Sequence, residues 1–331
     1  MKAKMATVVV PYARNRIAYA ICKSLKRAGH KVIAADSTPL AMCRWSKYVD
    51  GFEVYRTGTD AEFLQWAIRH QWEGHLIFPT FMEAWKLVAV HKVLPDIEII
   101  WKANSKQIVH ELCESLGIPA PWGRYMEQGV IKPAEERGAT GRRYFERAVV
   151  QERVAGEAIG VGMLFNKGRL KAKFCWRRLK EYPKDGGLSV VRESYRAPEQ
   201  EANAQELMEV LGWHGPAMVE FKGQYVLEVN PQFWGGLALA IESGVDFPRL
   251  TVDIMEKGDC EEVKEWEVGV KCSWLAGCIR RGCKPQGILE DWSKDDPLPF
   301  LGQFALPVWN FIKDRGTLSL QTSIMAAVWF L

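Results

Sequence analysis

Residues 217–236 read AMVEFKGQYVLEVNPQFWGG, a stretch that places two carboxylates and an amide within otherwise apolar strands. The polar segment 222–224 separates two runs rich in β-branched and aromatic residues, which predicts a β-hairpin with a three-residue loop. That loop length pairs Phe221 with Tyr225 across the hairpin. Because side chains alternate between the two faces of a strand, three oxygen-bearing side chains are then expected on one face: Glu220, Glu228 and Asn230.

Three such side chains on one face of a hairpin form a candidate metal site. Mg²⁺ prefers oxygen ligands and usually shares them with nucleotide phosphates. Diagonal neighbours on paired strands lie about 7–8 Å apart, a span that one or two ions could bridge. The alternative interpretation is a solvated outer face without a ligand, since acids are depleted in strands but are not rare there.

The N-terminal part of the chain follows the pattern of a parallel α/β domain. Residues 7–12 form a β-branched run, and Asn15 can cap the helix that follows it. Residues 31–36 and 75–78 read as further strands, with a second helical stretch between them. This β-α-β order predicts a Rossmann-like domain over residues 1–100.

The first turn of this domain, residues 11–16, reads PYARNR and contains no glycine. A turn without glycine keeps the backbone away from a pyrophosphate, so a nicotinamide cofactor is not expected here. Asp36 lies about twenty residues beyond the turn, where the ribose ligand of such a cofactor would be. We interpret it instead as a polar residue at the end of a strand.

Composition narrows the class of protein. The chain has 331 residues, enough for about two domains, and its 48% apolar and 25% charged residues exclude disorder, collagen and coiled coil. A net charge of +4 without a dense basic patch argues against nucleic acid as a partner. The 8 cysteines lack paired spacing, which favours a reducing compartment, and no apolar run reaches the roughly 18 residues of a membrane span. We expect a cytoplasmic protein that binds no membrane.

The C-terminal segment 298–331 is unusually apolar and carries Trp309 and Trp329. A helix lying on a membrane surface would need a basic polar face, for which the segment offers Lys313 and Arg315 alone. We therefore expect this segment either to be docked in a core or to form the interface of a homodimer.

Several short motifs follow one another in the middle of the chain. They are a helix that begins near Lys106, VIKP with Lys132, a glycine-bearing loop over 134–145, VQERVAGE over 150–157, and the hairpin 217–236. In this order they resemble the ATP-grasp superfamily, and within it the predicted carboxylate–amine ligases related to the large chain of carbamoyl-phosphate synthase. Each motif alone is a weak match, so the resemblance rests on their order.

The resemblance implies an architecture and a reaction. The fold is then α/β overall and α+β in its catalytic part: a Rossmann-like domain over 1–100, followed by an ATP-grasp domain over 101–331 with a small lid subdomain at about 118–153. The implied reaction is that of an ADP-forming ligase. Such an enzyme uses ATP, with Mg²⁺ or Mn²⁺, to activate a carboxylate as an acyl phosphate and joins it to an amine, so its partners are small molecules.

The resemblance also implies roles for residues that bind the nucleotide. Lys106 and Lys132 would contact its phosphates as point charges, the alternative being two surface lysines. Gly138 and Gly141 would belong to a lid loop that closes over the phosphates through backbone N–H groups. The nucleoside would be held by the segment after that loop, with Glu152, Arg153 and Val154 at the adenine and Glu157 at the ribose.

The remaining implied roles concern the metal and the transferred phosphate. The metal ligands are those of the hairpin: Glu220, Glu228 and Asn230. Asn230, Arg178 and Arg192 would act in catalysis, because an arginine fork binds carboxylate or phosphate bidentately; a solvated basic face is the alternative for the arginines. Gln232 stands where the family segment reads NPRFWG. This departure leaves a second interpretation open, a non-catalytic nucleotide sensor or scaffold on the same fold.

Overall fold

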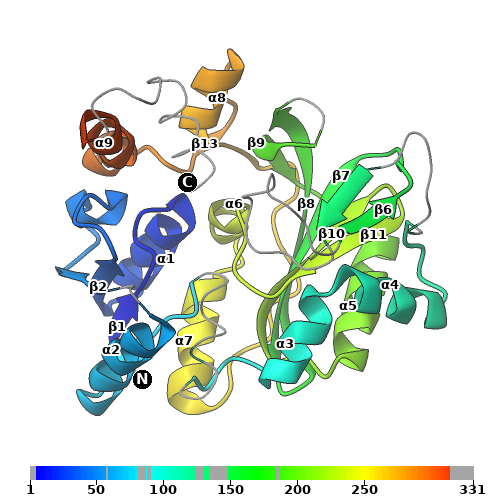
Figure 1. Cartoon of the computed structure of the whole chain (residues 1–331), viewed down its shortest axis with the longest axis horizontal. Coiled ribbons are helices and arrows are strands. Elements are labelled where there is room, and N and C mark those ends of the chain that lie inside the picture. Colours follow the sequence, from blue (N-terminus) through cyan, green and yellow to red (C-terminus); the bar gives the residue numbers. More distant parts are fainter. Residues whose placement is uncertain are drawn as a thin grey trace. The chain divides into compact units, whose positions relative to one another are not determined.

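The computed structural model describes residues 5–56, 59–80, 87, 91–121, 123, 130–133, 148–183 and 186–313 (Figure 1). Contacts among them divide the chain into two compact units. As far as their residues are described, the first comprises Met1–His91, Trp274–Ala276 and Leu289–Leu331, and the second comprises Lys92–Ser273 and Gly277–Ile288. The domain boundary at residue 100 and the lid at about 118–153 stay predictions.

The first unit contains a four-stranded parallel sheet in the order β3-β2-β1-β4. Its strands are β1 (Thr7–Val10), β2 (Lys31–Asp36), β3 (Gly51–Val54) and β4 (Leu76–Ile77). The helical elements between them are α1 (Arg16–Arg27), the 3-10 helix η1 (Met42–Trp45) and α2 (Asp60–Trp72). The predicted parallel α/β pattern of this part is confirmed.

Local sequence explains how α1 begins and how β2 ends. Asn15 caps α1, since its side-chain oxygen accepts a hydrogen bond from the backbone N–H of Ala18 at 2.8 Å. Asp36 is the last residue of β2 and is fully buried. Its carboxylate accepts from the backbone N–H of Arg14 at 2.9 Å and from Nε of the same residue at 3.1 Å. Asp36 is thus a strand-end polar residue that the chain's own arginine binds.

Helix α9 (Leu298–Lys313) packs against η1 within the first unit. A Cβ added to Gly302 would lie 2.5 Å from Cδ1 of Trp45, so the missing side chain allows the close approach of helix and indole. The start of the C-terminal segment, expected at the end of the second domain, therefore joins the first unit, and residues 314–331 lie outside the described part. None of the described helices is both long and apolar enough to cross a membrane.

The second unit is built on a larger sheet in the order β11-β10-β7-β8-β9-β12-β13, antiparallel from β11 to β12. These strands are β7 (Ala158–Asn166), β8 (Arg169–Tyr182), β9 (Leu188–Ser194), β10 (Gly215–Lys222), β11 (Tyr225–Asn230), β12 (Lys271–Ser273) and β13 (Ile288–Leu289). A two-stranded ladder pairs β5 (Val130–Pro133) with β6 (Ala148–Gln151). The hairpins predicted from β7 to β8 and from β10 to β11 are both present.

Among the described helices after residue 92, α3 and α4 contact β11, α5 contacts β7 and β8, and α7 contacts β10 and β7, while α8 begins in the first unit and continues in the second. Their bounds are α3 (Ile97–Asn104), α4 (Lys106–Ser115), α5 (Pro198–Val210), α6 (Leu237–Glu242), α7 (Phe247–Lys257) and α8 (Leu275–Arg281). The arrangement confirms an α+β architecture for the C-terminal part, which follows a Rossmann-like N-terminal part (Figure 1).

The hairpin of β10 and β11 differs in register from the prediction. Its loop is the two-residue turn 223–224 rather than three residues, and the glycine takes the positive φ that so tight a turn requires. Continued without a break, this register would place Glu220 opposite Leu227, which is the wrong face for Glu228. A β-bulge beside Glu220 shifts the pairing so that Glu220 lies opposite Glu228. The predicted loop is wrong, and the bulge restores the shared face.

Candidate active site

The residues predicted as metal ligands lie together on the β10–β11 ladder. Glu220 pairs directly with Glu228, and Nδ2 of Asn230 donates a hydrogen bond to Oε1 of Glu228 at 3.2 Å. The two glutamate side chains are 15% and 18% exposed, so they are accessible without being fully solvated. Two carboxylates and an amide oxygen are hard ligands of the kind that Mg²⁺ prefers, and this donor set fits that ion.

Lys106 reaches the carboxylates from the start of α4. Ser105 caps this helix by accepting a hydrogen bond from the N–H of Ile108 at 3.4 Å, which makes Lys106 its first residue. The Nζ group of Lys106 lies 3.1 Å from Oε2 of Glu228, and the lysine side chain is only 4% exposed. A buried ammonium group needs a charged partner, and Glu228 is one. The structure therefore places a predicted phosphate ligand beside the predicted metal ligands.

Arg178 on β8 approaches the other carboxylate. Its Nη2 lies 2.6 Å from Oε1 of Glu220, and its Nη1 lies 3.5 Å from Oε1 of Glu181. Burial acts to lower the pKa of Arg178, but the neighbouring carboxylates, Glu220 first, hold that pKa above its ordinary value. The guanidinium is therefore a fixed positive charge at the edge of the cluster.

Arg192 on β9 is differently placed. Its side chain is fully buried, and it donates hydrogen bonds to the carbonyl oxygen of Ser189 at 2.9 Å and to that of Gly235. Gly235 belongs to the segment that follows β11, so Arg192 holds this segment against the sheet. These contacts are those of a positioning residue, and the catalytic role predicted for Arg192 gains no support from them.

Two stacked indoles lie on the sheet, one from β8 and one from the segment after β11. Trp176 and Trp234 have ring centroids 5.8 Å apart with an interplanar angle of 8°. Their space exists because Gly160 and Gly162 on β7 carry no side chain; an added Cβ would lie 2.2 Å from Trp176 and 2.0 Å from Trp234, respectively. In the ladder Gly160 pairs with both Glu220 and Trp176, so the indoles and the carboxylates occupy one face.

The predicted hinge follows β6. Glu157 is half exposed, and one of its carboxylate oxygens lies 3.3 Å from Nη1 of Arg177. Arg177 on β8 also pairs with Glu193 on β9 at 2.8 Å, so the ribose ligand predicted here is linked through Arg177 to these two strands. Glu152, the first of the predicted hinge residues, lines a pocket, whereas Arg153 and Val154 do not line it.

This pocket has a volume of about 410 Å³ and lies within the second unit. Its lining comes from α4 and the segment after it, from the residue that follows β6, and from the β10–β11 turn with the start of β11: His110, Glu114, Ile118, Pro119, Ala120, Pro121, Glu152, Gln224 and Tyr225. The sequence did not single out His110, Gln224 or Tyr225. A signal for His110 was available, because it follows Lys106 by one helical turn and so shares its face.

Two residues of the predicted lid loop, Gly138 and Gly141, lie outside the described residues. For Lys132 the backbone is described, and it pairs with Val149 in the β5–β6 ladder. Gln232 is placed: its backbone N–H donates to the carbonyl oxygen of Asn230 at 2.9 Å, and its buried Oε1 has no hydrogen-bond partner among the described residues.

Comparisons with known proteins address the fold. A family model described as ATP-grasp in the biosynthetic pathway with Ter operon matches residues 144–278. The biotin carboxylase domain of 2-oxoglutarate carboxylase from Hydrogenobacter thermophilus, solved with MgADP, ADP and bicarbonate, has a TM-score of 0.62 at 14% identity over 81% of this chain and 74% of that one. L-amino acid ligase from Bacillus licheniformis has a TM-score of 0.57 at 14% identity over 75% and 73%.

A biotin carboxylase from Campylobacter jejuni, in complex with β-γ-ATP, gives a TM-score of 0.61 at 14% identity over 81% of this chain and 74% of that one. No curated protein matches the chain by sequence. The fold of this chain is similar to that of ATP-grasp proteins, and the family model matches its middle part. Its closer relation to the carboxylate–amine ligases stays a prediction.

Proposed function

We propose that this chain is an ATP- and magnesium-dependent ligase of the ADP-forming type. It would activate a carboxylate as an acyl phosphate and join it to an amine, with release of ADP and phosphate. The observation that carries the proposal is one cluster on the β10–β11 ladder: Glu220, Glu228, Asn230, Lys106 and Arg178. Ligand-bound biotin carboxylase domains and an amino acid ligase share the fold, which supports the assignment.

The charges of this cluster suit a metal–nucleotide complex. Glu220 and Glu228 face one arginine and one lysine, so the four side chains are balanced by themselves. When bound, Mg²⁺ supplies positive charge that offsets the phosphate oxygens of ATP. Glu220, Glu228 and Asn230 would hold the Mg²⁺ ion. Mn²⁺ also prefers oxygen ligands, so the same side chains would bind it. Lys106 would exchange Glu228 for a phosphate oxygen, a contact suited to a flexible ammonium group.

Arg178 is the group that would orient the acid substrate. Its guanidinium presents five donors in a fork that matches a carboxylate, and Glu220 holds the fork in place at 2.6 Å. A substrate carboxylate oxygen attacks the γ-phosphorus, and the bond from that phosphorus to the bridging oxygen of ADP breaks. The amine then attacks the acyl carbon, loses a proton, and expels phosphate. Arg178 stabilises the charge that develops on the oxygens in both steps.

The nucleoside part of the proposal uses the segment after β6. Glu157 can exchange its contact with Arg177 for ribose hydroxyls, because it is half exposed. Glu152, Arg153 and Val154 would hold the adenine through their backbone. Lys132 and the loop containing Gly138 and Gly141 would complete the phosphate site in this proposal.

The variant Glu228→Gln tests the cluster, because it removes a charge and keeps the shape. We expect it to abolish ATP-dependent phosphate release with candidate acids and amines, and to weaken MgATP binding measured by calorimetry. Glu209→Gln on α5 is the matched control, since Glu209 hydrogen-bonds its helix neighbour Gln205 at 2.8 Å. Asn230→Ala, which leaves the Lys106–Glu228 pair intact, serves as a second variant if Glu228→Gln fails to fold. Full activity in both folded variants would refute the assignment.

Gln232 favours one second candidate, a nucleotide sensor or scaffold without turnover. Its neutral side chain cannot anchor an anion as an arginine would. MgATP binding that depends on Glu228, without phosphate release for any acid and amine, would favour this candidate. The Hydrogenobacter biotin carboxylase domain was solved as a dimer. A homodimer is part of the ligase proposal, and light scattering of the full chain tests it.

A further inference from the structure

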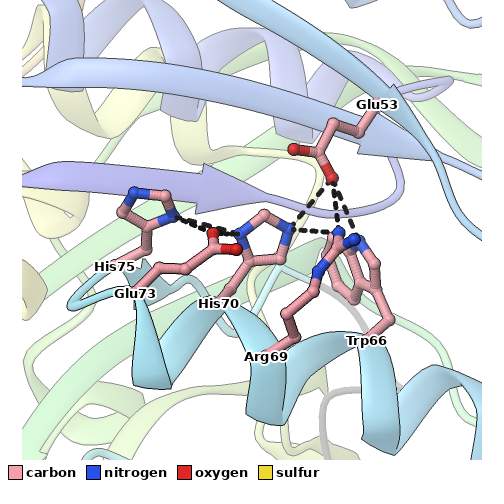
Figure 2. A network of polar contacts seen from close by, with 6 residues as sticks. All are labelled: Glu53, Trp66, Arg69, His70, Glu73 and His75. Atoms are coloured by element: carbon pink, nitrogen blue, oxygen red, sulfur yellow. Dashed lines mark hydrogen bonds and ion pairs between the residues drawn. The ribbon is translucent and has the colours of Figure 1, made fainter.

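A second cluster of ligating side chains lies in the first unit, at the C-terminal end of α2 (Figure 2). Its members are His70 in the last turn of the helix, Glu73 at the helix cap, and His75 just before β4. One ligand atom from each of these side chains lies within 4.8 Å of the others. The ligase site proposed above uses none of them.

Local backbone structure brings the two histidines together. Gly74 has a φ of 77°, a left-handed conformation that ends the helix. The N–H of Gly74 then donates to the carbonyl oxygen of Gln71 at 2.9 Å, and the N–H of His75 donates to that of His70 at 2.9 Å. These are the paired bonds of a Schellman motif, which folds His75 back over the last helical turn.

The three ligand atoms form a nearly regular triangle. Nδ1 of His70 lies 3.0 Å from Nδ1 of His75 and 3.5 Å from Oε2 of Glu73. Oε2 of Glu73 lies 3.4 Å from Nδ1 of His75. Neighbouring ligands of a tetrahedral Zn²⁺ ion, bound at about 2.0–2.1 Å, lie about 3.3 Å apart. The three edges therefore match one face of a zinc tetrahedron without any rearrangement of the backbone.

Glu53 on β3 fixes which nitrogen of His70 faces the triangle. Its Oε2 lies 3.0 Å from Nε2 of His70 and also accepts from Nη2 of Arg69 at 3.2 Å and Nε1 of Trp66 at 3.3 Å (Figure 2). An ionised carboxylate only accepts, so Nε2 of His70 carries the proton and Nδ1 of the neutral ring has the lone pair. A carboxylate behind a histidine is the usual support of a histidine that binds a metal.

We propose that His70, Glu73 and His75 bind one Zn²⁺ ion. The His70 side chain is 1% exposed and is held by Glu53, whereas the Glu73 side chain is 48% exposed, so the fourth position of the ion opens to water. Without the ion, Nδ1–H of His75 donates to Nδ1 of His70; on binding, the His75 proton moves to Nε2 of the same ring, and Nδ1 becomes a ligand. Through His70 and His75 the ion links the end of α2 to the residue before β4.

The test is equilibrium dialysis of the full chain, without a histidine tag, against Zn²⁺ in the presence of excess Mg²⁺. We expect one Zn²⁺ per chain, and a rise in melting temperature with Zn²⁺ that Mg²⁺ alone does not give, because imidazole suits Zn²⁺ and oxygen ligands suit Mg²⁺. Co²⁺ in place of Zn²⁺ should give the intense visible absorption of a tetrahedral site. Absence of bound Zn²⁺ would overturn the proposal.

Variants locate the ion. Glu73→Gln and His75→Gln replace accessible side chains and should each reduce Zn²⁺ affinity by at least about tenfold, while Glu53→Gln should reduce it by about 10–100-fold through the orientation of His70. His214→Gln, in the second unit, is the matched control and should bind Zn²⁺ as the parent does. Circular dichroism establishes that each variant is folded. Unchanged affinity in Glu73→Gln and His75→Gln would place the ion elsewhere, for example at cysteines, and would refute the site.

Discussion

Gly162→Ala is a small change with a large expected consequence for the indole stack. The added Cβ would lie 2.0 Å from Cζ2 of Trp234, a distance that no side chain tolerates. Any movement of Trp234 disturbs its neighbours, because it is buried between Trp176, with centroids 5.8 Å apart, and Phe247, at 4.9 Å in an edge-on contact. Either the indole leaves its rotamer or β7 moves.

The magnitude follows from the cost of overpacking. An extra methyl group forced into a well-packed core costs about 1–3 kcal/mol. In a folded unit of about 150–250 residues, each kcal/mol of lost stability lowers the melting temperature by about 2–4 °C. The second unit has about this size, so we expect its melting temperature to fall by about 2–12 °C. Trp234 follows Asn230, a proposed metal ligand, by four residues, so we expect MgATP affinity to fall together with stability.

Thermal unfolding followed by tryptophan fluorescence measures the effect. The control is Gly51→Ala, where the nearest atom to the new Cβ is Cγ1 of Ile33 at 3.9 Å, an ordinary contact; its effect should stay within about 0.5 kcal/mol. In the double variant with Trp234→Phe the smaller ring should relieve the clash, so the two costs should not add. An unchanged melting temperature in Gly162→Ala, or full additivity in the double variant, would refute this reasoning.

Three further outcomes are expected. Lys132→Met keeps the apolar stem and deletes the charge, so calorimetry should show weaker ATP binding at a nearly unchanged melting temperature; equal affinity would make Lys132 a strand-end residue only. Arg192→Met removes a fully buried donor from two partly buried carbonyl oxygens, at up to about 1–3 kcal/mol each, and chemical denaturation should show this loss. Hydrogen bonds from Asn166 and Lys171 lower the pKa of Asp259 from 3.8 to about 2. The stability that these bonds give is therefore fully present above the ordinary pKa and is lost as the pH falls through about 2. Carbon NMR of the Asp259 carboxyl group should find a titration midpoint near 2, and a midpoint near 3.8 would contradict the contacts.

The local elements of this protein could be read from its sequence because short-range chemistry fixes them. Asn15 caps α1, as predicted, since a cap needs only its own side chain and the next backbone N–H groups. The hairpin signals at residues 166–168 and 222–224 also gave two real hairpins. The order of the motifs also indicated the ATP-grasp fold, because each motif is a short stretch of neighbouring residues that can be recognised without the tertiary structure.

The register of the β10–β11 hairpin could not be predicted from the sequence, for a physical reason. A two-residue turn with a bulge and a three-residue turn without one place Glu220 and Glu228 on the same face. The choice between them depends on contacts of the turn with another segment: the N–H of Gly223 donates to the carbonyl oxygen of Glu157 at 2.8 Å. The alternation of apolar and polar residues within the hairpin does not predict this contact with a distant segment.

The sequence by itself determined the residue types of the candidate site and the class of fold, because apolar periodicity and the order of motifs are properties of neighbouring residues. Only the tertiary structure decided which charges meet. Lys106 pairs with Glu228 and Arg178 with Glu220, whereas Arg192 turns to backbone carbonyls. Such pairings join positions far apart along the chain, and they are chosen by burial and by the geometry of the sheet, which a list of residues does not contain.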